Sequence, residues 1–154
     1  MSNWPQLLAN DFGFFHPGTS SVSASGLVEA PCGWDRWVDL ARDQPIRPVL
    51  DLYNLARHMG FQVFFITARN AEQRKATIAN LRSAGYKGWD DQDLITEPDA
   101  SHYPYAAPFK AEGRRKLTDA GYTIVLNIGD QDSDLRGGFA DRVFKLPNPF
   151  YYIP

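Results

Sequence analysis

The spacing of apolar residues predicts an alternation of helices and buried strands from Trp34 onward. Apolar positions three or four residues apart predict helices over 34–44, 48–59, 71–84 and 110–120. Short runs rich in β-branched and aromatic residues predict strands over 61–66, 122–128 and 142–146, and a short edge strand over 93–96. Strands that alternate with helices form parallel sheets with right-handed crossovers. We therefore predict an α/β fold with helices on the faces of a parallel sheet.

Residues 1–33 lack this regularity. They contain glycines and prolines typical of turns, a polar stretch from Thr19 to Ser25, and no sustained period of 2 or 3.6 residues. We predict a single domain made of an irregular N-terminal arm, residues 1–33, which is a candidate cap remnant, and an α/β core, residues 34–154.

Composition narrows the class of protein without naming a chemistry. A chain of 154 residues with 44% hydrophobic and 22% charged residues has the profile of one globular domain. The net charge of −2, with both signs mixed, gives no reason to expect a nucleic acid or a membrane as partner. The longest apolar run is too short for a transmembrane helix, and the chain as given has no signal peptide, so we expect a cytoplasmic protein. The single cysteine, Cys32, excludes an intrachain disulfide.

Chemically functional side chains follow two of the predicted strands. Thr67 and Arg69 come directly after the strand over 61–66, and a loop with three aspartates follows the strand over 122–128: Asp130, Asp132 and Asp134. In an open parallel sheet, ligands bind beyond the carboxyl ends of the strands. Oxygen ligands gathered there suit Mg²⁺, which keeps several waters and often bridges a protein to phosphate. We therefore predict a site for a small phosphorylated substrate or phosphate, with Thr67 and Arg69 as binding residues.

Each of these features also has a purely structural interpretation. A hydroxyl such as that of Thr67 commonly caps the following helix, an aspartate-rich loop is commonly a solvated turn, and most lysines are exposed. As part of a site, Lys110 would add a positive charge for the same phosphoryl anion.

Together these segments resemble the acid phosphatase branch of the haloacid dehalogenase (HAD) superfamily. This branch includes plant acid phosphatases, vegetative storage proteins and bacterial outer-membrane acid phosphatases. Residues 64–69 are similar to its second motif, Lys110 to the lysine of its third, and residues 129–135 to its fourth. Residues 144–153 match the C-terminus of the family. The resemblance covers nearly the whole chain and implies a HAD-like, Rossmann-like fold.

The resemblance also implies a role for each matching residue. It implies that the Thr67 hydroxyl holds the transferring phosphoryl group, with Lys110 as a second catalytic and substrate-binding residue. It implies that Asp130 ligates Mg²⁺ directly and that Asp134 is its partner in the metal site. Relatives of this kind are often periplasmic or secreted.

One motif of the family is missing. The first motif, Asp-x-Asp-x-Thr after an apolar strand, supplies the nucleophile and the general acid/base, and it occurs nowhere in this sequence. In the family, a segment like Ser2 to Gln6 comes just after that motif, so the resemblance implies a chain that begins too late to contain the central strand.

The loss of a central strand has a physical consequence. It would leave a slot of about 10 Å between the strands that end at Thr67 and Ile128. Unpaired buried peptide groups cost roughly 1–3 kcal/mol each, so the slot cannot stay open. We expect that the two strands pair directly or that a domain-swapped homodimer exchanges an element. A third alternative is insertion of the N-terminal arm, with residues 11–15 or 20–28 as weak strand candidates.

The function expected from this reasoning is Mg²⁺-dependent phosphomonoester hydrolysis, of the acid phosphatase type and weak because the usual nucleophile is absent. Asp11, Asp132 or Asp134 could replace the nucleophile, or Mg²⁺ on Asp130 could activate water directly. The alternative is a non-catalytic HAD-fold protein or a truncated product that binds phosphate or metal or serves a structural or storage role.

Overall fold

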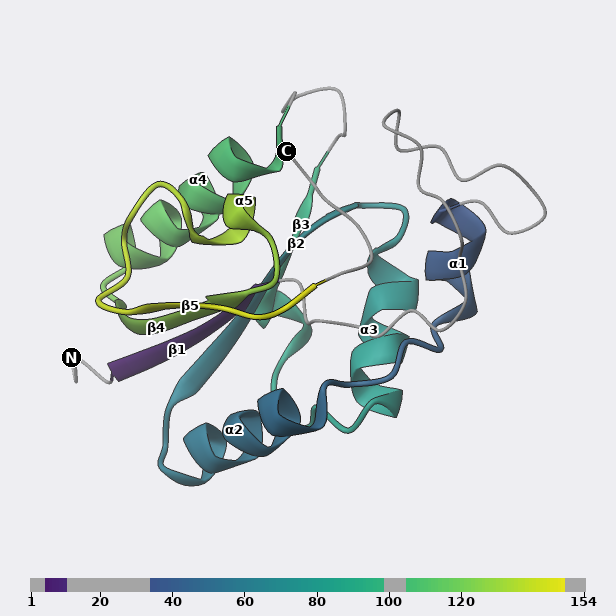
Figure 1. Ribbon diagram of the computed structural model, residues 1–154, viewed down its shortest axis with the longest axis horizontal. Coiled ribbons are helices and arrows are strands. Elements are labelled where there is room, and N and C mark those ends of the chain that lie inside the picture. Colours follow the sequence, from purple (N-terminus) through teal and green to yellow (C-terminus); the bar gives the residue numbers. More distant parts are fainter. Residues whose placement is uncertain (1–4, 11–33, 99–104, 149–154) are drawn as a thin grey trace.

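A five-stranded parallel sheet forms the centre of the molecule (Figure 1). The computed structural model describes residues 5–10, 34–98 and 105–148, with the backbone alone for 5–10 and 34–36. The strands lie in the order β3-β2-β1-β4-β5. Their bounds are β1 Pro5–Asn10, β2 Gln62–Asn70, β3 Leu94–Glu97, β4 Thr123–Gly129 and β5 Val143–Lys145.

Helices cover both faces of this sheet. Figure 1 shows α4 and α5 on one face, and α2 and α3 on the other, with α1 beside α3. Their bounds are α1 Trp34–Leu40, α2 Arg47–His58, α3 Arg74–Ser83, α4 Ala106–Asp119 and α5 Asp132–Leu135, with a 3₁₀ turn at Asp91–Asp93. None of the helices in the described part of the chain has the length and hydrophobicity needed to cross a bilayer.

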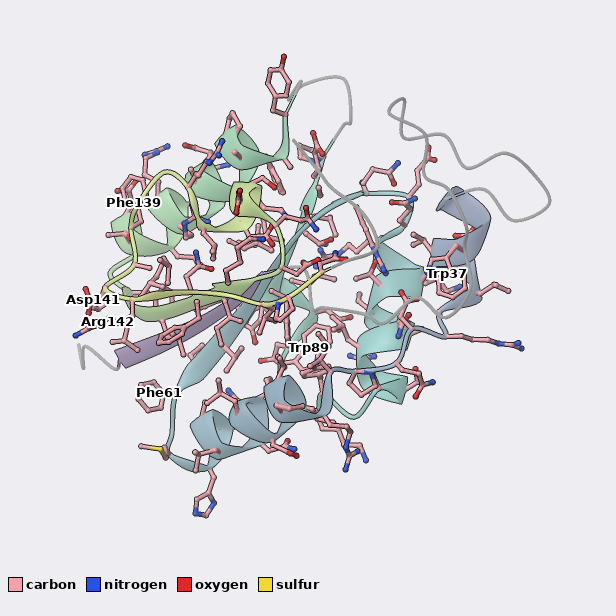
Figure 2. All side chains as sticks on the ribbon, viewed as in Figure 1. Trp37, Phe61, Trp89, Phe139, Asp141 and Arg142 are labelled. Atoms are coloured by element: carbon pink, nitrogen blue, oxygen red, sulfur yellow. The ribbon has the colours of Figure 1, made fainter. Side chains whose placement is uncertain are left out.

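The strand β2 is buried on both faces, which explains its continuous apolar sequence. Val63 and Phe65 pack toward α2 and α3, in a cluster that includes Trp89. Figure 2 shows Trp89 in the layer between these helices and the sheet. Phe64 and Ile66 point to the opposite face, where they pack with residues of α4. The alternation of side chains along one strand thus builds the two halves of the core.

The centre of the sheet differs from our expectation. We predicted direct pairing of the strands now seen as β2 and β4, or a swapped dimer, but β1 lies between them and pairs in parallel with both. The inserted segment belongs to the arm that we expected to be irregular. Insertion of the arm was our third alternative, but it occurs through residues 5–10, which we did not predict as a strand. The strand candidates that we named, residues 11–15 and 20–28, lie outside the described residues. Because β1 pairs with both strands, the unpaired peptide groups that motivated a swap are satisfied within one chain.

The other elements confirm the predicted alternation, with differences at their ends. The helix α4 begins at Ala106, four residues before its predicted start, since Pro108 is tolerated in a first turn that needs no N–H donor there. The segment of α5 was predicted as a loop, and four residues are too short for a helical period to appear in the sequence.

Candidate active site

The two predicted strand ends lie at the same edge of the sheet and at the same height. Ala9 of β1 pairs with both Phe65 of β2 and Ile128 of β4. Two residues further along the chain, Thr67 and Asp130 are therefore level with each other. Thr67 lies within β2, which continues to Asn70 instead of ending before Thr67 as predicted, and Asp130 is the first residue after β4. Because one strand separates them, the two backbones are about 10 Å apart.

Asp134 forms a buried ion pair with Lys110. The Nζ of Lys110 donates to Oδ1 of Asp134, and both side chains are fully buried. The backbone N–H of Gln131 donates to Oδ2 of Asp134 at 2.8 Å, so both carboxylate oxygens have partners. Lys110 lies in the second turn of α4, which packs against β2, β4 and α5. This packing brings together the third and fourth motif segments, 24 residues apart in the sequence.

Asp130 has a different environment, although it is also buried. Its Oδ2 accepts hydrogen bonds from Nε2 of Gln131, at 3.1 Å, and from Nδ2 of Asn148. Its Oδ1 is buried and accepts no hydrogen bond from any described residue. Its backbone carbonyl accepts from Nζ of Lys145 at 3.1 Å. Asp130 therefore has one buried carboxylate oxygen without a hydrogen-bond partner among the described residues.

The loop that carries both aspartates is held by groups that sequence reasoning did not select. Arg114 is fully buried and donates to three backbone carbonyls: Asp134 at 2.7 Å, Gly138 at 2.9 Å, and Arg136. Burial lowers the pKa of the Arg114 guanidinium, and the nearby Asp134 charge opposes this shift. Asn127 Nδ2 donates to the same Asp134 carbonyl at 3.0 Å.

The glycine that precedes Asp130 is required by close packing. A Cβ on Gly129 would collide with the side chain of Asp134. Any larger residue would therefore displace Asp134 from Lys110.

Thr67 and Arg69 differ in how far they are available to a substrate. Thr67 is buried, and its Oγ1 accepts the backbone N–H of Arg69 at 3.2 Å, which leaves its O–H free to donate. Arg69 instead forms a buried ion pair with Asp43 at 2.8 Å and a hydrogen bond to Thr77 at 3.4 Å. The guanidinium predicted to bind substrate thus links the end of β2 to the segment between α1 and α2.

The structure brings Lys110, Asp130 and Asp134 together and places Thr67 at the same edge. It directs Arg69 toward Asp43. The residues missed by sequence reasoning are Asp43, Arg114, Asn127, Gln131 and Asn148. A usable signal existed for Arg114, since it lies four residues after Lys110 and so shares a helix face with it. The other four residues gave no such signal. Their partners are distant in the sequence, or they are common polar residues whose position follows no recognisable pattern.

The donor set at this edge fits a divalent cation that keeps most of its waters. Among the described residues, no group of three or more His, Cys, Asp and Glu side chains could hold a metal. A hydrated divalent cation such as Mg²⁺, however, is commonly bound through one or two carboxylates together with substrate phosphates. The buried, unpartnered Oδ1 of Asp130 is the candidate ligand of this kind.

The fold and these motifs define a HAD-like α/β protein. The sequence profile of the HAD superfamily, subfamily IIIB (acid phosphatase), matches residues 24–154. The chain therefore belongs to this family of acid phosphatases, which generally use a divalent metal.

Curated relatives and a solved structure agree with this assignment. Acid phosphatase 1 of Solanum lycopersicum is 39% identical over 121 residues, covering 78% of this chain and 47% of the relative. Vegetative storage protein 1 of Arabidopsis thaliana is 36% identical over 126 residues, covering 81% of this chain and 46% of the relative. The chain thus spans about half the length of the curated relatives it matches.

The class C acid phosphatase from Bacillus anthracis has the same fold. Its structure matches with a TM-score of 0.69 at 19% identity and covers 99% of this chain and 70% of that chain.

Proposed function

We propose that this chain carries a Mg²⁺-dependent phosphomonoester hydrolase site of the acid phosphatase type. One observation carries the proposal: the unpartnered, buried Oδ1 of Asp130, which lies level with Thr67 across one strand. Membership of subfamily IIIB supports the same chemistry.

Each residue at the edge of the sheet has a distinct role in this proposal. Asp130 would hold Mg²⁺ through its carboxylate, and the cation would supply positive charge that stabilises the phosphoryl oxygens and activates water. The Thr67 hydroxyl donates to a phosphoryl oxygen. Lys110 neutralises Asp134 and so fixes the loop, since its ammonium group is fully buried against that carboxylate.

The source of the nucleophile decides how fast such a site works. Asp134 is unsuited to attack, because Lys110 and the Gln131 N–H occupy both of its oxygens. Asp132 is half-exposed and 3.5 Å from Nζ of Lys145, so it remains a candidate. Asp11 lies outside the described residues. With water or Asp132 as the nucleophile we expect slow turnover, because neither has the positioning of the usual motif.

The test is hydrolysis of p-nitrophenyl phosphate by the purified chain, with Mg²⁺ and with EDTA. We expect turnover that requires Mg²⁺ and falls at least about tenfold in Asp130→Asn, as removal of a metal ligand does. Asp141→Asn is the matched control, since this exposed aspartate lies beside Arg142 at the opposite end of the sheet (Figure 2). Turnover that survives EDTA and Asp130→Asn would reject the proposal.

A non-catalytic role is the second candidate. It is favoured by the similarity to a relative named vegetative storage protein 1. This candidate predicts no turnover of p-nitrophenyl phosphate, while Mg²⁺ or phosphate still raises the melting temperature by binding the folded state. Cytoplasmic location remains a prediction under either candidate.

A further inference from the structure

We propose that Asn148 is a positioning residue for Asp130, and that its side-chain amide keeps the Asp130 Oδ1 oxygen turned toward a divalent cation. This inference rests on the metal-binding part of the proposed function. It does not depend on whether the bound site turns over a substrate.

The hydrogen bonds around Asp130 separate its two oxygens. Two amide groups, Nε2 of Gln131 and Nδ2 of Asn148, donate to Oδ2. No described residue donates to Oδ1, which is nevertheless buried. A carboxylate that rotates about its Cβ–Cγ bond would exchange these oxygens. Two donors on one oxygen oppose that rotation and keep the other oxygen free.

The chemical type of the donors matters as much as their number. An amide donates a hydrogen bond without carrying a charge, so neither donor to Oδ2 neutralises the Asp130 carboxylate. Asp134, four residues away, is paired with the ammonium group of Lys110 and so has its charge neutralised. The structure thus gives a neutral partner to the carboxylate that can bind a cation.

Backbone contacts bring Asn148 to this position. The N–H of Leu146 donates to the carbonyl of Gly129 at 2.8 Å, and Nζ of Lys145 donates to the carbonyl of Asp130. The chain after β5 is therefore attached beside the Asp130 loop independently of the Asn148 side chain. Because of this attachment, we expect that replacement of Asn148 leaves the fold intact.

The test measures cation binding without any substrate. Mn²⁺ is the probe, and its free concentration is followed by electron paramagnetic resonance in wild type, Asn148→Ala and the exposed control Asn54→Ala. We expect the Mn²⁺ Kd to rise about 10–100-fold in Asn148→Ala, as is typical when a partner of a metal ligand is lost. Urea unfolding in EDTA should give the same midpoint for all three proteins.

Asn148→Leu is the second variant, because leucine has a similar size but no hydrogen-bond donor. It should weaken Mn²⁺ binding to the same extent as Asn148→Ala. Unchanged Mn²⁺ binding in either Asn148 variant would overturn the proposal, as would a wild-type chain that binds no Mn²⁺. Wild-type binding of Mn²⁺ that Asn148→Ala weakens, without any p-nitrophenyl phosphate turnover, would reject the proposed hydrolase and leave the role of Asn148 standing.

Discussion

Asp130 and Asp134 are aspartates four positions apart in one loop, but their surroundings differ in charge. Asp134 is compensated by an ammonium group, whereas Asp130 is bonded to two neutral amides. A buried carboxylate without a counter-charge is costly, so it persists where a cation or several hydrogen bonds offset its desolvation. Asp134 is therefore the carboxylate that holds the loop, and Asp130 is the carboxylate that we propose for cation binding.

The buried pair gives a stability prediction. Lys110→Met leaves the Asp134 carboxylate buried without its cation and is expected to lower the free energy of unfolding by about 3–5 kcal/mol. Urea denaturation measures this change. Lys116→Met is the matched control on the same helix, because Lys116 is 67% exposed and lies 3.9 Å from Glu112. We expect about 1 kcal/mol or less for that exposed pair, and equal losses in the two variants would contradict the argument.

A second residue-scale prediction concerns alkaline pH. Burial raises the pKa of the Tyr53 hydroxyl to about 12, and this hydroxyl donates to the carbonyl of Lys87 at 2.6 Å. The folded state favours the neutral phenol, so its contribution is complete below about pH 10, the unfolded value, and is lost as pH rises through 12. Urea midpoints measured from pH 8 upward should fall over this window.

Tyr53→Phe tests the assignment. It should lose about 1 kcal/mol at pH 8, where the hydrogen bond is intact, and should show a shallower decline above about pH 10. Some decline should remain, since burial also raises the pKa of Tyr86. An identical decline in Tyr53→Phe and wild type would exclude Tyr53 as a source of alkaline sensitivity.

At the scale of elements, α4 connects the core to the site. Its inner face contains Lys110, Gly113 and Arg114, all buried. Gly113 allows a close approach to β2, because a Cβ there would lie 3.0 Å from Cδ1 of Ile66. The two cations on this face hold Asp134 by its side chain and by its carbonyl. One helix thus positions the fourth-motif loop relative to the sheet.

Two neighbouring arginines on α4 provide a matched comparison. Arg114→Lys leaves one ammonium group in place of a guanidinium that donates to three carbonyls. We expect a loss of about 3 kcal/mol, since at least one buried carbonyl loses its donor at roughly 1–3 kcal/mol each. Hydrogen exchange of the amides in 132–138 should accelerate. Arg115→Lys alters only exposed pairs with Glu112 and Asp119 and should cost about 0.5 kcal/mol. Similar exchange in both variants would rule out a special role for Arg114.

At the scale of the whole molecule, β1 joins two halves of the sheet. β2 and β3 lie on one side of it and β4 and β5 on the other. Thr67 belongs to the first half, while Asp130 and its partners belong to the second. The height and separation of these two residues therefore depend on the strand between them.

Ala9→Pro tests this arrangement. Proline lacks the N–H that a central strand contributes to its ladder, so we expect a loss of about 3 kcal/mol or more in the free energy of unfolding. Ala9→Val, which suits a strand, is the control and should retain a cooperative transition near that of wild type. Comparable urea midpoints for the two variants would mean that β2 and β4 pair without β1.

Local sequence patterns were sufficient to predict much of the fold. The apolar periods of α2, β2 and β4 lie within single elements, so the parallel α/β class could be predicted. The position of Thr67 and Asp130 toward the carboxyl ends of β2 and β4 could also be predicted, although β2 continues to Asn70. β1 escaped prediction because Pro5–Asn10 contains no β-branched or aromatic residue and its stability comes from pairing with two strands distant in sequence. Its central position was decided by the unpaired edges of β2 and β4 rather than by its own propensity.

The sequence by itself determined which types of side chain follow the strands, and hence the prediction of a phosphate- and metal-binding chemistry. Only the tertiary structure decided their partners: Lys110 with Asp134, Arg69 with Asp43, and Asn148 with Asp130. The physical reason is the separation along the sequence between the residues that interact. Hydrophobic periodicity acts between residues three or four positions apart, whereas these contacts join residues 18 to 26 positions apart, and packing of the helices and loops around the sheet brings them together.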